Sequence, residues 1–129
     1  MAVRVWGVAG DRLVEVHISR GVPRIEGLPP DRERTTRDRV RAALINSGLL
    51  QEVPPVMIQL EPPIRSGATD QLDLAIALAV LGEAGLPGKG FRWILATGRL
   101  GLDGCVFSPL LSKLPSNVTV VTVLEELVR

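Results

Sequence analysis

Alternating apolar and polar positions at the start of the chain predict a β-hairpin. Residues 1–9 and 12–19 are rich in β-branched side chains, and Gly10 and Asp11 separate them. A third, shorter strand is expected at residues 22–26, because glycine and proline interrupt the pattern around it. In the second strand the predicted apolar face consists of Val14, Val16 and Ile18.

Helical periodicity begins after the Pro29-Pro30 pair and continues to Ser47. We expect Asp31 or Thr35 to cap this helix, and Gly48 to end it with a positive φ angle. The buried stripe is predicted to be Val40, Ala43, Leu44 and Ser47, and the opposite face to be Arg32, Arg34, Arg37, Arg39 and Arg41.

The second half of the chain predicts a central helix between strands. Residues 56–61 have the pattern of a buried strand, and Thr69 is a suitable N-cap for a helix at residues 70–84. That helix is apolar on nearly every side, so we expect it in the core with Leu74, Ile76, Ala77, Val80 and Leu81 deeply buried.

The remaining residues predict further strands and a short terminal helix. Strands are expected at residues 91–97, 100–107 and 118–123, a tight turn at Asp103 and Gly104, and a helix at residues 124–129. Residues 1–129 are therefore expected to form one α+β domain, with a mixed sheet, two main helices and a short C-terminal helix.

Composition excludes several classes of function. The 129 residues have a formal net charge of +1, so the charge of the whole chain does not indicate binding to nucleic acid or membrane. One cysteine, Cys105, and one histidine, His17, exclude a disulfide framework and a cysteine or multi-histidine metal site, and we expect no cofactor. The sequence has neither an apolar run of about 18 residues nor a signal-peptide pattern, which favours a cytoplasmic location.

Two carboxylates, Asp70 and Asp73, are expected on one face of the central helix because they are three residues apart. Such a pair could hold a divalent ion or act in acid–base catalysis. Acidic residues are also common in first helical turns because the helix dipole favours them, and we prefer this structural interpretation. His17 is expected on the surface, because strand alternation puts it opposite the apolar face, and Cys105 in the core, because it falls in an apolar strand.

A nucleophile would have to be a serine, and the sequence contains no G-x-S-x-G motif. A Ser–Lys pair is the remaining option, with Ser66 or Ser112 as the nucleophile and Lys113 or Lys89 as its base. Ser66 precedes the amino end of the central helix, where an oxyanion site is chemically reasonable. No phosphate-binding loop is present, so no ATPase is predicted.

Residues 31–41 carry five arginines against Asp31, Glu33 and Asp38. Such a face is usually solvated or internally paired. The alternative is a weak contact with a phosphate backbone or a subunit. Aromatic residues that could stack on bases are scarce, with two Trp, two Phe and no Tyr.

Four segments resemble the N-terminal domain of the ComM-type, magnesium-chelatase-like AAA+ proteins. They are VEVHISRGVPRIEGLP at residues 14–29, RDRVRAALINSG at 37–48, MIQLEPP with DLAIALAVL between 57 and 81, and GRLGLDGCV at 98–106. The resemblance implies the fold of the Lon proteolytic domain, in the ribosomal protein S5 domain 2-like superfamily. Its motif positions include Asp70, Asp73, Asp103 and Gly104.

Departures from the family pattern change what the resemblance implies. In active Lon proteases the serine lies at the position of Asp73, where ComM-type domains also carry Asp, so the resemblance implies that the nucleophile is absent. The helix that carries the Lon lysine is expected to be deleted after Pro109, which leaves Lys113 one residue out of register. The motif glutamate is replaced by Arg99. Because the chain ends at Arg129, we expect a shortened, stand-alone domain without the AAA+ motor.

Three functions therefore stay open. The first is a non-proteolytic interaction or assembly module, a pseudo-enzyme linked by resemblance to competence, DNA uptake and recombination. The second is a divergent Ser–Lys peptidase, and the third is a nucleic-acid-binding module that uses the helix face from Arg32 to Arg41. For the first we expect a homo-oligomer or an AAA+ partner protein, with an exposed apolar surface near Val106, Leu110 and Leu111 as the contact.

Overall fold

The computed structural model describes residues 4–10, 12–65, 69–84, 93–96, 98–102, 106–107 and 119–121. The strands are β1 (Arg4–Ala9), β2 (Arg12–Arg20), β3 (Arg24–Glu26), β4 (Val56–Glu61), β5 (Trp93–Ala96), β6 (Arg99–Leu100), β7 (Val106–Phe107) and β8 (Thr119–Val121). The helices are α1 (Pro30–Asn46), the 3-10 helix η1 (Thr69–Leu72) and α2 (Asp73–Glu83).

The sheet is mixed, with the strand order β3-β4-β2-β1-β5-β8. The long strand β2 pairs antiparallel with β1 and with β4, whereas β3, β5 and β8 each join a parallel neighbour. Val16 lies opposite Val5 on β1 and Leu60 on β4, so these three side chains share one face of the sheet. All three are buried, which confirms the predicted hairpin and its apolar face.

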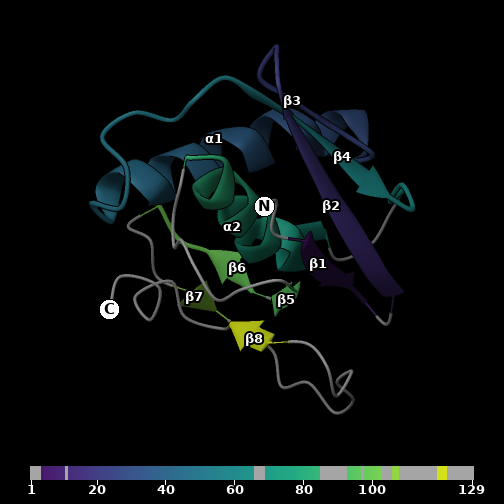
Figure 1. Cartoon of the computed structure of the whole chain (residues 1–129). Helices are drawn as coiled ribbons and strands as arrows, with labels where there is room; N and C mark the ends of the chain where they lie inside the picture. Colours follow the sequence, from purple (N-terminus) through teal and green to yellow (C-terminus); the bar gives the residue numbers. More distant parts are fainter. Residues whose placement is uncertain are drawn as a thin grey trace.

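Both main helices lie on the same side of the sheet (Figure 1). Helix α2 packs against β1 and β2, and α1 packs against α2 and β3. The core lies between these layers, and α2 contributes nine consecutive buried residues from Asp73 to Leu81. The prediction of a central helix with a fully buried interior is therefore confirmed, as is an α+β fold with a mixed sheet and two helices.

Two helix starts differ from the predictions. Neither Asp31 nor Thr35 caps α1: its N-cap is Pro29, which makes no side-chain capping bond, and Pro30 is the first helical residue. Proline suits this position because its φ angle is preset and its missing N–H would have no partner in the helix. The buried stripe of α1 contains Thr36 in addition to Val40, Ala43 and Leu44, whereas Ser47, which was predicted to belong to it, is exposed. After the helix, Gly48 has the expected positive φ of 83°.

The central helix also begins later than predicted. Residues Thr69–Leu72 form η1, so Thr69 is not the N-cap of α2, and α2 starts at Asp73. The reason is tertiary: the Gly98 N–H donates to the Gln71 carbonyl, and the Leu74 N–H donates to the Gly98 carbonyl. Gly98 therefore pairs with the Gln71 carbonyl and the Leu74 N–H, which a continuous helix at residues 70–84 would have paired within itself.

The prediction of one strand at residues 100–107 is wrong. Residues 99–100 and 106–107 pair antiparallel as β6 and β7, so this segment forms a short hairpin. The predicted turn at Asp103 and Gly104 and the predicted helix at 124–129 lie outside the described residues. Among the described ranges, no helix has the length and apolar character needed to span a bilayer.

Candidate functional site

The family-motif position Asp73 is the centre of a buried polar cluster at the start of α2. The Arg39 Nε donates to Asp73 Oδ2 at 2.7 Å, and Arg39 Nη2 donates to Oδ1 at 3.0 Å. The backbone N–H of Leu100 donates to the same Oδ2 at 3.0 Å. The Asp73 side chain has no solvent exposure, and that of Arg39 is 20% exposed.

Three segments distant in the sequence position this cluster. Arg39 comes from the middle of α1, Asp73 is the first residue of α2, and Leu100 belongs to β6. The exchange of backbone hydrogen bonds between Gly98 and the start of α2 holds β6 against the helix. The Asp73 carboxylate consequently joins both helices and the short hairpin at one point.

Burial raises the pKa of the Asp73 carboxyl, and this effect outweighs the hydrogen bonds from Arg39 and Leu100 and the charge of Arg39, all of which lower it. The hydrogen bond with Asp73 raises the pKa of the Arg39 guanidinium, against the opposing effect of burial. A carboxylate with these partners is held in place by three donors. It has no lone pair directed at open solvent.

Asp70 and Asp73 both face α1, but they belong to successive elements, Asp70 to η1 and Asp73 to α2. Asp70 lies in η1, its side chain is 41% exposed, and Oδ1 is 3.5 Å from Arg32 Nη1. Each carboxylate therefore has its own arginine partner on α1. Within the ranges that the structure describes, no group of three His, Cys, Asp or Glu side chains could hold a metal ion.

The arginine face of α1 is largely paired with neighbouring acids. Arg34 lies 3.9 Å from Asp38 and Arg37 lies 3.3 Å from Glu33, both one helical turn apart. Arg37 Nη1 also donates to the Pro23 carbonyl at 2.9 Å. The expectation that Arg39 lies on this outer face is wrong, because its guanidinium turns inward to Asp73.

Other candidate residues divide between the surface and the undescribed segments. His17 is exposed, as predicted, and its Nε2 lies 3.2 Å from Glu15 Oε1. The candidates Ser66, Ser112, Lys89 and Lys113, the motif residues Asp103 and Gly104, and Cys105 lie outside the described residues. The structure therefore brings together Asp73, Asp70 and their arginines, but it describes no serine–lysine pair.

Sequence reasoning missed Arg39 as the partner of Asp73, although a signal was present. Thr36, Val40 and Ala43 form the buried stripe of α1, and all three are at most 4% exposed. Arg39 is three residues after Thr36 and four before Ala43, so it lies on the border of that stripe. A long side chain at this border can reach a buried acid on the neighbouring helix.

The chain matches a known protein family over most of its length. A family model described as the subunit ChlI of Mg-chelatase matches residues 14–120, which include α1, α2 and both aspartates. The chain belongs to this family. The resemblance found in the four sequence segments is thereby confirmed at the level of the family.

Curated relatives of this magnesium-chelatase-like family match the chain over part of their own length. The uncharacterized protein YifB of Escherichia coli K12 is 43% identical over 70 residues, which is 53% of this chain and 14% of YifB. YifB of Salmonella typhimurium LT2 is 35% identical over 72% of this chain and 19% of its own length. An uncharacterized protein of Mycobacterium tuberculosis H37Rv is 33% identical over 89% of this chain and 24% of its own length. The chain thus spans less than a quarter of the relatives that it matches.

Proposed function

We propose that this domain is a non-proteolytic, Lon-like interaction or assembly module of the magnesium-chelatase-like family. The observation that carries the proposal is the state of Asp73, at the position where the resemblance places the Lon serine. Its carboxylate is buried and accepts hydrogen bonds from Arg39 and the Leu100 amide. An acid held in this way supplies no nucleophile, and it fixes how two helices and a hairpin meet.

The proposal includes self-association or binding to an AAA+ partner. Strand β3 forms one end of the described six-stranded sheet and β8 forms the other. An edge strand has backbone groups that can pair with another chain. The α1 side chains of Glu33 and Arg37 already bond to the β3 segment, at the Ile25 N–H and the Pro23 carbonyl. The β8 end is therefore the better candidate for assembly, and we propose a two-fold dimer as its simplest form.

A role in DNA uptake or recombination belongs to the same proposal, as a part played through protein contacts. Nucleic-acid binding by the arginine face is less favoured, because Arg32, Arg37 and Arg39 have acidic partners within the chain. Peptidase activity is less favoured because Asp73 replaces the nucleophile of the Lon pattern. Both alternatives predict measurable activities that the assembly role does not.

Light scattering over a wide dilution series tests the assembly role. We expect a mass above that of one chain that decreases on dilution, with little dependence on salt. Incubation with a fluorophosphonate probe tests the peptidase alternative, and we expect no labelling beside an active serine hydrolase as a positive control. A monomer at every concentration, alone and mixed with an AAA+ protein of the family, would contradict the proposal, and so would labelling that Ser66→Ala or Ser112→Ala removes.

A further inference from the structure

A half-open cavity of about 220 Å³ lies between α1, β3, the segment before β4 and α2. It is separate from the Asp73 cluster, and none of the residues in that cluster lines it. Its walls are mostly aliphatic side chains and prolines, among them Val40, Val53, Pro54, Ile76 and Val80. An apolar space of about 150 Å³ can hold benzene, so this cavity has room for one leucine or phenylalanine side chain.

The walls of the cavity are fixed before any ligand arrives. The Ile25 N–H donates to Glu33 Oε2 at 2.9 Å, and Arg37 Nη1 donates to the Pro23 carbonyl, so β3 is tied to α1. On the other side the Gly21 N–H donates to the Pro55 carbonyl at 3.2 Å. Preformed walls reduce the entropy lost on binding.

Charged side chains at the cavity are mostly arginines. Arg24, Arg37 and Arg41 line it together with a single acid, Asp38. Arg37 is paired with Glu33, and Asp38 lies 3.9 Å from Arg34. The side chains of Arg24 and Arg41 are exposed, and their guanidinium groups make no ion pair or hydrogen bond with the described part of the chain. Two cations are thus free to meet carboxylates at the border of an apolar space.

We propose that this cavity binds an acidic peptide segment of another protein, with one aliphatic or aromatic side chain inserted between Val53 and Val80. Carboxylates on either side of that residue pair with Arg24 and Arg41. The inference rests on the proposed interaction role and gives its partner a chemistry. The segment binds through side chains, since Glu33 and Arg37 occupy the Ile25 N–H and the Pro23 carbonyl that strand addition would use.

Other occupants fit the cavity less well. Pockets for drug-sized ligands and cofactors usually have volumes of about 300–1,000 Å³, which is more than this space offers. Nucleic acid needs aromatic or planar surfaces on which bases stack, and no aromatic side chain is among the lining residues. The combination of a small apolar cavity and unpaired arginines favours an acidic peptide.

Selection from a phage-displayed library of random peptides, with the full chain as bait, tests this inference. We expect enriched peptides to carry acidic residues on both sides of a single leucine, isoleucine, methionine or phenylalanine. A labelled enriched peptide should bind about tenfold more weakly to Arg41→Glu, where a rim charge is reversed, and to Val53→Phe, where the cavity is filled. Serine in place of the apolar residue of the peptide should weaken binding similarly.

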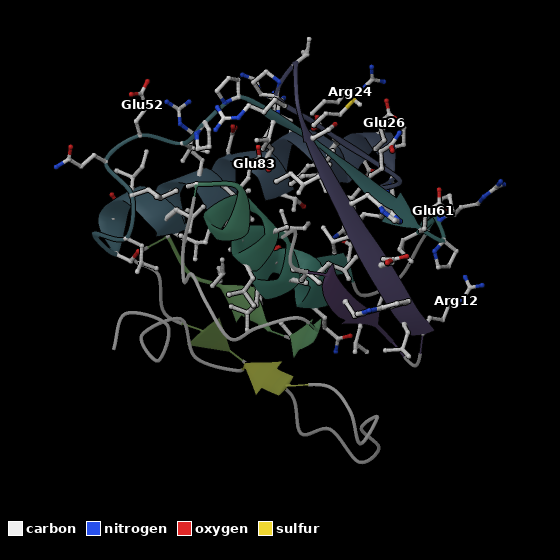
Figure 2. The ribbon with its side chains drawn as sticks, in the orientation of Figure 1. Arg12, Arg24, Glu26, Glu52, Glu61 and Glu83 are labelled. Carbon is white, nitrogen blue, oxygen red and sulfur yellow. The ribbon has the colours of Figure 1, made fainter. Side chains whose placement is uncertain are left out.

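Arg12→Glu is the matched control, because it makes the same charge change at the far end of β2 from Arg24 (Figure 2). The affinity of Arg12→Glu for the labelled peptide should equal that of the unmodified chain. Thermal unfolding should show that every variant is folded. No enrichment of acidic peptides, or equal affinity for all variants, would overturn the inference. Binding of a single-stranded oligonucleotide that Arg41→Glu reduces and Val53→Phe does not would also overturn it.

The outcome separates this inference from the proposed function. An oligomer in light scattering without peptide enrichment overturns the cavity as a binding site and leaves the assembly role in place. Peptide binding that depends on Arg41 and Val53 in a strictly monomeric chain supports the cavity and removes self-association.

Discussion

Arg39 and Asp73 form a two-pronged ion pair between α1 and α2, with both hydrogen bonds at 3.0 Å or less. A guanidinium that binds a carboxylate through two parallel hydrogen bonds fixes both the distance and the relative orientation of the partners. Because the Asp73 side chain is fully buried, the pair also offsets part of the penalty of a charge in the core. The contact therefore specifies how the two helices meet.

Removal of Arg39 should destabilise the domain strongly. We expect Arg39→Ala to lower the free energy of unfolding by about 3–5 kcal/mol, because it leaves Asp73 charged and buried without its partner. Arg34→Ala is the control, since its pair with Asp38 is exposed and should contribute less than about 1 kcal/mol. Urea unfolding at neutral pH measures both values. Similar losses in the two variants would mean that the buried pair is energetically equivalent to a surface pair.

Replacement of both partners by apolar residues should recover most of that loss. In Arg39→Met/Asp73→Leu neither charge is buried, so the double variant should be more stable than Arg39→Ala. The Leu100 N–H loses its acceptor in this variant, which limits the recovery. A double variant as unstable as Arg39→Ala would show that the stability comes from the hydrogen bond between the Leu100 N–H and Asp73 rather than from pairing of the two charges.

The stability deficit of Arg39→Ala should become smaller as the pH falls. Burial raises the pKa of Asp73 in the folded chain, and Arg39 opposes this, so its removal raises that pKa further. A group whose pKa is higher in the folded than in the unfolded state contributes stability below its unfolded pKa, and this contribution is lost as the pH rises through the folded pKa. The difference from the unmodified chain should therefore be smaller at about pH 5 than at neutral pH.

A variant without the titrating group is the control for this pH dependence. In Arg39→Ala/Asp73→Asn the difference from the Asp73→Asn single variant should not change with pH. Urea unfolding at both pH values gives the four differences needed. An Arg39→Ala deficit that is constant with pH would contradict the prediction, and a deficit that still changes with pH in the Asp73→Asn background would assign the titration to another carboxyl group.

Leu81 on α2 should be a stability determinant of the core. Its side chain is 1% exposed, and we expect Leu81→Ala to cost about 2–5 kcal/mol through lost burial and the cavity left behind. Ile45→Ala on α1 is a useful comparison, because Ile45 is 36% exposed and should cost much less. A Leu81→Ala loss below about half a kilocalorie per mole would show that α2 is peripheral.

Gly27 should tolerate no side chain. Its φ angle is +100°, and a Cβ placed there would lie 2.9 Å from both the Cβ and the carbonyl oxygen of Leu60. Gly48 has a similar φ of +83° with open space around it, so Gly48→Ala isolates the backbone strain of about 1–2 kcal/mol. Gly27→Ala should be clearly more destabilising than Gly48→Ala in thermal unfolding. Equal effects would show that Leu60 moves aside freely.

The sequence predicted those parts of the site that depend on local pattern. The acids Asp70 and Asp73 and the arginines of α1 were identified from their types and spacing. Their pairing was not, because Arg39 and Asp73 are 34 residues apart and meet only when α1 lies against α2. The cavity beside Arg41 was missed for the same reason, since four separate segments line it.

The sequence alone determined the strand and helix periodicity, the central place of α2 and the family, because repeating apolar positions and local motifs are properties of neighbouring residues. It placed β4 at its observed bounds, where proline follows the last strand residue. Tertiary structure decided where α2 begins, because the Gly98 N–H donates to the Gln71 carbonyl before the helix and the Gly98 carbonyl accepts from the Leu74 N–H. It also decided that Arg39 points inward, since a buried carboxylate on another helix outweighs the preference of a cation for water.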